Sequence, residues 1–442
     1  MLSTLREFYA RPKVRIFASN LGWLIGEKFL RLVFNVFVGF WVARYLGPGR
    51  FGQLNYALAL ASVGVAVAEC GVEAIVKREL IAAPARGVAL LRAAWLLRLS
   101  LGAGCYLLLL AWTWLGVTDA GDRVTLALAG LMLFQPALAV GDLWLQATLR
   151  ARTAVLAQVV MLTAGALGRV VLIRIGAPVW AFAAISAGEF LLAALLLTAL
   201  ARRAGLRWPA PDRDARSARD LFQTAWPLMV SSLAVILYMR IDIVMLRAMQ
   251  GDAAAGIYAA AVKISELGYF LPVALGSSLL PALLRARAAG REAYGRRLQQ
   301  YFDLSAVLAY GLAVPGALLA PWLIRRVYGD SFTTAGPVLA LHVWGAVFVF
   351  IGVARAHYLF NEGLGRLHLI ATAAGALLNV GLNAVLIPLH GPWGAALATI
   401  IAQAFVTWGL SFAFGPTRWV GRMQTRALLI PFNWYRYVRR AE

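Results

Sequence analysis

The feature that most constrains this chain is a succession of long apolar stretches running from residue 16 almost to the C-terminus. Each is about as long as the roughly 20 residues with which a helix crosses a hydrocarbon core of about 30 Å. Hydrophobic residues make up 61% of the chain and charged residues only 14%, which excludes an ordinary water-soluble domain. The pattern predicts an all-α integral membrane protein with about twelve transmembrane helices. They are expected at residues 16–43, 52–76, 89–116, 124–148, 153–173, 178–201, 221–247, 254–283, 302–324, 334–360, 367–389 and 393–415.

The net charge of +22 indicates membrane topology rather than nucleic-acid binding, because Lys and Arg are retained on the cytoplasmic side of membrane proteins. If both termini are cytoplasmic, the segments on that side carry 28 Lys and Arg residues and the opposite side carries 7. This ratio predicts cytoplasmic termini and favours an even number of helices.

The longest hydrophilic stretch, residues 202–220, divides the chain into two halves. It contains two prolines and dense charge, which predict a cytoplasmic linker. An N-terminal six-helix lobe is expected over residues 1–201 and a C-terminal six-helix lobe over residues 221–415. Residues 416–442 combine six arginines with Trp and Tyr, which is typical of a basic and aromatic interfacial tail in the cytoplasm.

The two halves share weak motifs at equivalent positions. Residues 47–52 follow the first predicted helix, and residues 251–256 follow the seventh with the same glycine spacing. Residues 172–178 and 386–392 form a second matching pair, before the sixth and twelfth helices. With equal helix numbers in each half, these matches favour a duplicated six-helix unit whose copies are related by an axis along the membrane normal.

We assign fourteen charged residues to the membrane interior. At roughly 3 kcal/mol each on the insertion scale, they would cost on the order of 40 kcal/mol if they faced lipid. Most are therefore expected to face the protein interior or a water-filled cavity. The cations are Lys28, Arg31, Arg98, Arg169, Arg240, Lys263 and Arg355; the acids are Glu27, Glu69, Glu73, Asp142, Glu189, Asp242 and Glu266.

The spacing of these charges separates two interpretations, structural ion pairs and a polar translocation path. In the first helix Glu27 and Arg31 are four residues apart, on one polar stripe. Any single residue could belong to a structural ion pair, but the whole set favours a translocation path.

Some of the charged residues and histidines have individual expectations. Arg98 and Arg169 are expected to snorkel or to pair locally. Glu69 lies near the end of the second helix, where its alternative role is to cap that helix. The two histidines of helix ten, His342 and His357, are expected to be satisfied interior residues.

No pattern in the sequence indicates catalysis. The outside loops are short, and the chain lacks a GxxxxGK[ST] phosphate loop, metal-ligand spacing and a Ser/His/Asp arrangement. Cys70 and Cys105 lie in apolar segments and suggest neither a disulfide nor a metal site. The sequence therefore predicts a protein that is not an enzyme, with no catalytic residues, no cofactor and no metal.

Several stretches are similar to those of one transporter family. The first-half stretches, NLGWLIGEKFLR, VARYLGP with FGQLNYA, and GVEAIVKREL, lie at residues 20–31, 42–57 and 71–80. The second-half stretches lie at residues 240–266 and 379–396. They resemble Wzx-like O-antigen and capsule flippases of the multidrug/oligosaccharidyl-lipid/polysaccharide exporter superfamily. The family's asparagine before the second proline motif has no match in the first half, where Arg169 stands, so no role is carried over to Arg169.

The resemblance implies two six-helix lobes forming a V around a central, often cationic cavity. It implies translocation of undecaprenyl-pyrophosphate-linked oligosaccharide units, as used for O-antigen, lipopolysaccharide or capsule, across the bacterial inner membrane by alternating access. A proton or sodium gradient would drive it. The implied partners are the lipid-linked oligosaccharide, membrane lipids and the polysaccharide polymerase machinery, without nucleic acid.

On this interpretation the cations should attract the substrate pyrophosphate, which Arg binds through a planar fork. The expected cavity residues are Lys28, Arg31, Arg240, Lys263 and Arg355. Four acids are expected to pair with cations in the empty state and to serve ion coupling, because a carboxylate that loses its cation in a dry cavity binds a proton more readily. These acids are Glu27, Glu69, Asp242 and Glu266.

Three alternatives remain open. An exporter of another lipid-linked polymer, such as the peptidoglycan precursor, would be expected to have fourteen spans instead of twelve. A multidrug/cation antiporter would be expected to have an acidic and aromatic cavity, whereas cations and acids are balanced at seven each. A scaffold without transport activity would need no buried charges.

Overall fold

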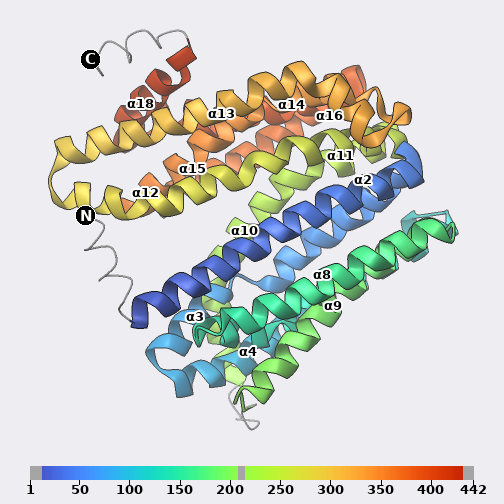
Figure 1. The fold of residues 1–442 in the computed structure, drawn as a ribbon, viewed down its shortest axis with the longest axis horizontal. Helices are drawn as coiled ribbons and strands as arrows, with labels where there is room; N and C mark the ends of the chain where they lie inside the picture. The colour runs from blue at the N-terminus through green and yellow to red at the C-terminus, as the bar shows by residue number, and fades with distance from the viewer. Residues whose placement is uncertain (1–11, 208–214, 432–442) are drawn as a thin grey trace. The chain divides into compact units, whose positions relative to one another are not determined.

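The structure, a computed structural model, describes residues 12–207 and 215–431, and this part of the chain is almost entirely helical, with no strand (Figure 1). The chain forms two compact units. The N-terminal unit comprises Met1–Leu46 and Gln53–Ile236, and the C-terminal unit comprises Gly47–Gly52 and Leu237–Glu442. The side chains of Glu27 and Lys28 lie outside the described residues, as do residues 208–214 of the predicted linker and residues 432–442 of the predicted tail.

The N-terminal unit packs its helices around a buried cluster that includes Val76, Leu91, Leu145 and Ala225. Helix α9 lies against both α5 and α8, and α3 lies against α4 and α7. The unit contains α2 (Pro12–Glu69, apart from Gly47–Gly52), α3 (Glu73–Ala82), α4 (Pro84–Gly116), α5 (Ala120–Gly130), η1 (Leu131–Phe134), α6 (Gln135–Leu138), α7 (Val140–Ala147), α8 (Ala151–Arg174), α9 (Val179–Arg203) and the first part of α10 (Ala215–Gln250).

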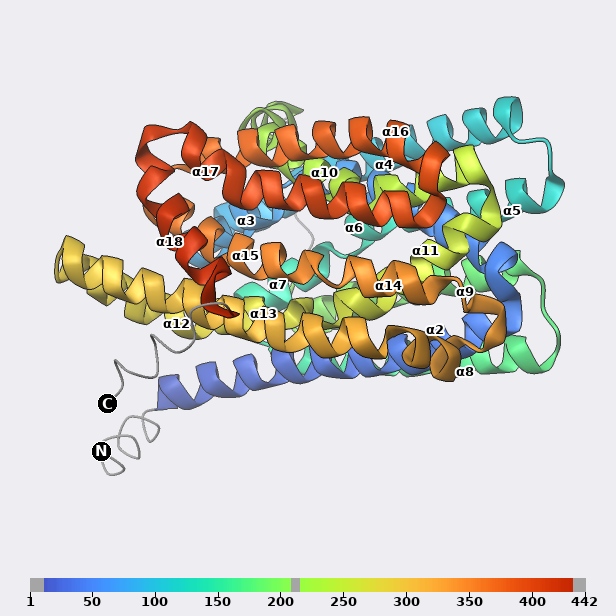
Figure 2. The ribbon, with the colours of Figure 1, turned by 90° about the horizontal axis from the view of Figure 1, so that it is seen from above.

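The C-terminal unit is built around α13, which packs against α12, α14, α15 and α18 (Figure 2). Leu298, Phe302, Phe350 and Ile351 are fully enclosed in its core. Besides the end of α10, the unit contains α11 (Asp252–Ser265), η2 (Glu266–Tyr269), α12 (Phe270–Ala288), α13 (Arg291–Tyr328), η3 (Asp330–Phe332), α14 (Ala335–His342), α15 (Gly345–Asn361), α16 (Gly365–Ala404), the π-helical turn η4 (Phe405–Gly409), α17 (Leu410–Ala413), η5 (Gly415–Thr417) and α18 (Arg418–Leu428).

Within the described residues, ten helical stretches are long and apolar enough to cross a membrane, which confirms a multi-pass all-α membrane protein. Two of them, Val36–Ala82 and Gly365–Ala413, contain 47 and 49 residues, about twice the length that one crossing needs. The first breaks at Gly47 (φ 70°) and the second at Gly391 (φ 57°). The stretch Gly365–Ala413 can therefore supply two of the predicted crossings, and α2, which begins at Pro12, can supply one crossing on each side of Gly47. The count of twelve and the V arrangement stay predictions.

The motifs shared by the two halves have a common backbone geometry. Gly47 and Gly251 have φ values of 70° and 86°, and Gly176 and Gly391 have values of 71° and 57°. Glycine adopts positive φ values without the steric cost that a Cβ brings. The glycine spacing seen in the sequence thus marks equivalent left-handed turns, as a duplicated unit requires.

Candidate functional site

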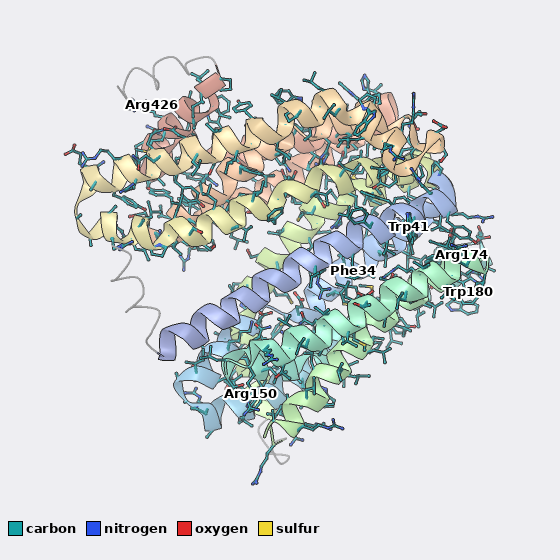
Figure 3. All side chains as sticks on the ribbon, viewed as in Figure 1. Phe34, Trp41, Arg150, Arg174, Trp180 and Arg426 are labelled. Carbon is teal, nitrogen blue, oxygen red and sulfur yellow. The ribbon has the colours of Figure 1, made fainter. Side chains whose placement is uncertain are left out.

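The N-terminal unit carries two of the predicted site residues with described side chains, Arg31 on the first part of α2 and Glu69 at the end of that helix. Farther along the chain, Arg150 and Arg174 lie at opposite ends of α8, and Trp180 lies near Arg174 at the start of α9 (Figure 3). Charged and aromatic side chains at the ends of an apolar helix are typical of the two membrane–water interfaces.

Other charges of this unit are used in local contacts. The Arg169 guanidinium lies 2.7 Å from a Glu189 carboxylate oxygen and also donates to Ser186. The buried Arg98 donates to the carbonyl oxygens of Glu69 at 3.4 Å and Pro136 at 3.1 Å. The prediction of local pairing is therefore confirmed for Arg169, and Arg98 is satisfied mainly by backbone carbonyls.

The C-terminal unit contains a buried polar cluster centred on Asp242, which lies on α10 and is 2% exposed. One carboxylate oxygen accepts hydrogen bonds from the Tyr258 hydroxyl at 2.5 Å and the Thr399 hydroxyl at 2.6 Å. The other accepts from the Asn383 amide at 2.5 Å. Asn383 also donates to the Asn379 side-chain oxygen at 3.1 Å. These five residues, from α10, α11 and α16, form the Asp242 cluster.

The donors in the Asp242 cluster are all neutral. The side-chain oxygen of Asn383 and the side-chain nitrogen of Asn379 have no hydrogen-bond partner within the described part of the chain. An ionised carboxylate enclosed by neutral groups is costly unless a cation or proton accompanies it. Carboxylate, amide and hydroxyl oxygens are the ligands that hard cations prefer. The cluster thus has the chemistry of a site for a small hard cation or a proton. Among the described residues, no group of three or more His, Cys, Asp and Glu is arranged to hold a metal.

Three more predicted site residues lie close to the Asp242 cluster in sequence. Arg240 lies 3.9 Å from a carboxylate oxygen of Glu266, and both side chains are partly exposed. The Lys263 ammonium lies 5.3 Å from the centre of the Phe51 ring, a cation–π geometry. The Arg240 pair is at the outer limit of ion-pair distance, so a stronger anion could replace Glu266 there.

Arg355 is placed differently from the other predicted cavity cations. It lies on α15, is 2% exposed, and donates from Nε to the Ser411 hydroxyl at 3.0 Å. Its Nη2 has no hydrogen-bond partner among the described residues. Arg355 is therefore enclosed by the C-terminal unit beside α17.

The predicted interior histidines are hydrogen-bonded. His342 Nδ1 lies 2.6 Å from the Ser265 hydroxyl, and His357 Nδ1 lies 2.9 Å from the Tyr301 hydroxyl. The prediction that they are satisfied interior residues is confirmed. The sequence did not single out Thr399, Asn379 and Asn383 as site residues. The sequence signal that could have identified this site is the pair Asn379 and Asn383, which lie four residues apart in an otherwise apolar span.

Residues 17–287 match the family described as polysaccharide biosynthesis protein, and residues 227–385 match the MatE family. The probable flippase AglR of Haloferax volcanii is 30% identical over 206 residues, which are 44% of this chain. The match spans only 41% of that relative's length.

Among solved structures, the lipid II flippase MurJ in an inward closed conformation has a TM-score of 0.70 at 14% identity, covering 94% of this chain and 92% of that one. An inward-facing multidrug resistance MATE transporter has a TM-score of 0.66 at 18% identity, covering 89% and 96%. A superfamily transporter from Pyrococcus furiosus, described as having a binding pocket of reverse polarity, has a TM-score of 0.60 at 17% identity, covering 93% and 97%. At these identities the likeness shows a shared transporter fold. The chain belongs to the polysaccharide biosynthesis protein family, within the multidrug/oligosaccharidyl-lipid/polysaccharide exporter superfamily that its sequence motifs resemble.

Proposed function

We propose that this protein is a flippase that moves an undecaprenyl-pyrophosphate-linked oligosaccharide across the bacterial inner membrane by alternating access, coupled to a sodium or proton gradient. The observation that carries the proposal is the family match over residues 17–287. A relative described as a probable flippase and the fold shared with a lipid II flippase support it.

In this proposal, partly exposed cations attract the pyrophosphate. Arg240 is held only loosely by Glu266, at 3.9 Å. The pyrophosphate group carries more total negative charge than one carboxylate, and two of its oxygens can accept a forked pair of hydrogen bonds, so it competes with that carboxylate. Lys263, one turn before Glu266, adds a second positive charge nearby. Loading of substrate would then release the Glu266 carboxylate.

The coupling ion in this proposal binds the Asp242 cluster. Its oxygens come from helices that are far apart in sequence, since Asp242 contacts residues 141 and 157 positions away. A cation or proton held there would draw α10 and α16 together, and its departure would leave an enclosed carboxylate with neutral donors only. Such an ion therefore favours one packing of these helices over another, which is what coupling requires.

Complementation of a flippase-null strain tests the cationic site. Arg31→Ala, Arg240→Ala and Lys263→Ala should each reduce surface glycan at unchanged membrane abundance. Arg297→Gln is the matched control, because this arginine on α13 is exposed and donates to the side chain of neighbouring Gln300 at 3.0 Å. Arg31→Lys should be nearly as damaging as Arg31→Ala if forked contact matters, and milder if charge alone matters. Full surface glycan from all three alanine variants would overturn the cationic site.

The match to MatE over residues 227–385 favours one second candidate, a multidrug/cation antiporter. Asp242 and Glu266 would then bind the cationic substrate. Proteoliposomes distinguish the two functions: movement of a cationic dye, together with failure to complement the flippase-null strain, would establish the antiporter. Complementation of a strain depleted of its lipid II flippase would instead identify an exporter of the peptidoglycan precursor.

A further inference from the structure

A pocket of about 350 Å³ opens in the C-terminal unit where several apolar helices end. It lies between the end of α12, the start of α13, the end of α15 and α18. It shares no residue with the Asp242 cluster and contains none of the predicted cavity cations. Its lining comprises Arg287, Arg291, Tyr294, Tyr358, Glu362 and Trp419.

The two arginines of the pocket differ in what they contact. Arg287 forms a fork with Glu362, with Nε 3.2 Å from one carboxylate oxygen and Nη2 3.3 Å from the other, and it also donates to the Asn361 carbonyl. Arg291 is exposed, and none of the ion pairs among the described residues involves it. One acid against two arginines leaves the lining with a net positive charge, carried by Arg291.

The aromatic wall of the pocket is fixed by its own hydrogen bonds. The Trp419 indole donates to the Tyr358 hydroxyl at 3.1 Å, and that hydroxyl donates to the Pro416 carbonyl at 3.0 Å. The Tyr358 and Trp419 rings meet edge to face, with centroids 5.6 Å apart. The buried Tyr294 hydroxyl lies near Glu362 and has no hydrogen-bond partner of ordinary geometry among the described residues.

The start of α13 adds to the positive character of the pocket. The helix has 38 residues, and its N-cap is Gly290, which has no side chain to cap the first turn. The free N–H groups of that turn and the aligned peptide dipoles attract an anion. Arg291 and Tyr294 occupy this turn and line the pocket. The positive charge of Arg291, the free amides of the first turn and the Tyr294 hydroxyl therefore all lie at this pocket. Its volume is typical of small-ligand sites.

Helix α18 indicates where the ligand comes from. Its exposed face carries Arg418, Arg422 and Arg426 at four-residue intervals, and the opposite face packs Val420 and Ala427 into the core. A basic helix beside the ends of apolar spans lies in the headgroup layer, where it attracts anionic lipids. Basic pockets between helix ends on that side of a membrane bind phosphate-bearing headgroups. We infer that the α12–α13–α15–α18 pocket binds the phosphate headgroup of an anionic membrane phospholipid, through Arg291 and the first turn of α13.

Native mass spectrometry of the full-length protein with added phosphatidylglycerol tests this inference. Arg291→Gln should weaken phosphatidylglycerol binding by at least roughly tenfold, because it removes a charge-assisted hydrogen bond to phosphate. Arg297→Gln, on the same helix but outside the pocket, should bind as the wild type does. Thermal unfolding should be the same for both variants, since Arg291 has no ion-pair partner to leave behind.

Two further binding measurements identify the class of ligand. Phosphatidylcholine should bind much more weakly than phosphatidylglycerol, and excess inorganic phosphate should not displace the bound lipid. Equal binding of the two lipids, displacement by phosphate, or equal lipid binding by Arg291→Gln and Arg297→Gln would each overturn the inference. The measurement involves no transported glycan, so its failure leaves the flippase proposal untouched.

Discussion

Gly52 and Gly256 lie against each other's backbone within the C-terminal unit. A Cβ on Gly52 would collide with the Asp252 carbonyl oxygen, and a Cβ on Gly256 would collide with the Pro48 carbonyl oxygen. Pro48 and Asp252 are equivalent positions of the repeat, so the contact is reciprocal. The glycine spacing shared by the two halves is therefore required by the way in which the two motifs pack.

Alanine at either glycine should destabilise the protein. The helices would have to separate to admit a methyl group, and overpacking of this kind costs about 1–3 kcal/mol. The control is Gly49→Ala, in the same motif, because a Cβ there meets nothing within 4 Å. Thermal unfolding in detergent should show a lowered Tm for Gly52→Ala and Gly256→Ala and little change for Gly49→Ala. Equal Tm values for all three would show that the close contact does not stabilise the fold.

The Asp242 cluster predicts an ion-dependent stability. If sodium binds there, it should raise the Tm of the wild-type protein in proportion to RT ln(1 + [Na⁺]/Kd). Asp242→Asn removes the charge at nearly constant size and should abolish this rise, together with gradient-driven transport. Asp330→Asn is the control, since the Asp330 side chain is 91% exposed at a helix end. A wild-type sodium response and gradient dependence retained in Asp242→Asn would remove the cluster from the coupling mechanism.

The Arg169–Glu189 pair predicts a purely structural effect. The Glu189 side chain is 7% exposed, so Arg169→Gln leaves an enclosed carboxylate without its cation. Removing one partner of a buried pair costs roughly 3–5 kcal/mol, whereas replacing both by apolar residues is often neutral. Arg169→Gln should lower the Tm and the membrane abundance, and the Arg169→Met/Glu189→Leu double variant should recover both. A double variant as unstable as the single one would mean that the charges themselves are needed.

The sequence predicted the helical membrane fold because the length of its apolar stretches is enough to decide it. The repeat motifs at residues 47–52 and 386–392 contain the glycines at which the two long helices break, Gly47 and Gly391. The partners of Asp242 were not predictable in the same way. Thr399 and Asn383 approach it only through the packing of α10 on α16, at separations of 157 and 141 residues. Tertiary packing also decides that Arg355 is enclosed beside Ser411. For the same reason the sequence predicted an interfacial tail but not the pocket beside α18.

The topology prediction can be tested by cysteine labelling in a variant without Cys70 and Cys105. The count of 28 cations against 7 predicts that the linker at residues 202–220 lies in the cytoplasm and that the loop before α5 lies outside. Ser217→Cys reports on the linker. Thr118→Cys is preferable to Asp119→Cys for the outer loop, because the Asp119 side chain accepts a hydrogen bond from the Asp122 amide at 2.8 Å and caps α5. A membrane-impermeant maleimide applied to intact cells should label Thr118→Cys at once and Ser217→Cys only after the cells are permeabilised. Labelling of Ser217→Cys in intact cells would reverse the orientation, and with it the leaflet from which the proposed substrate is loaded.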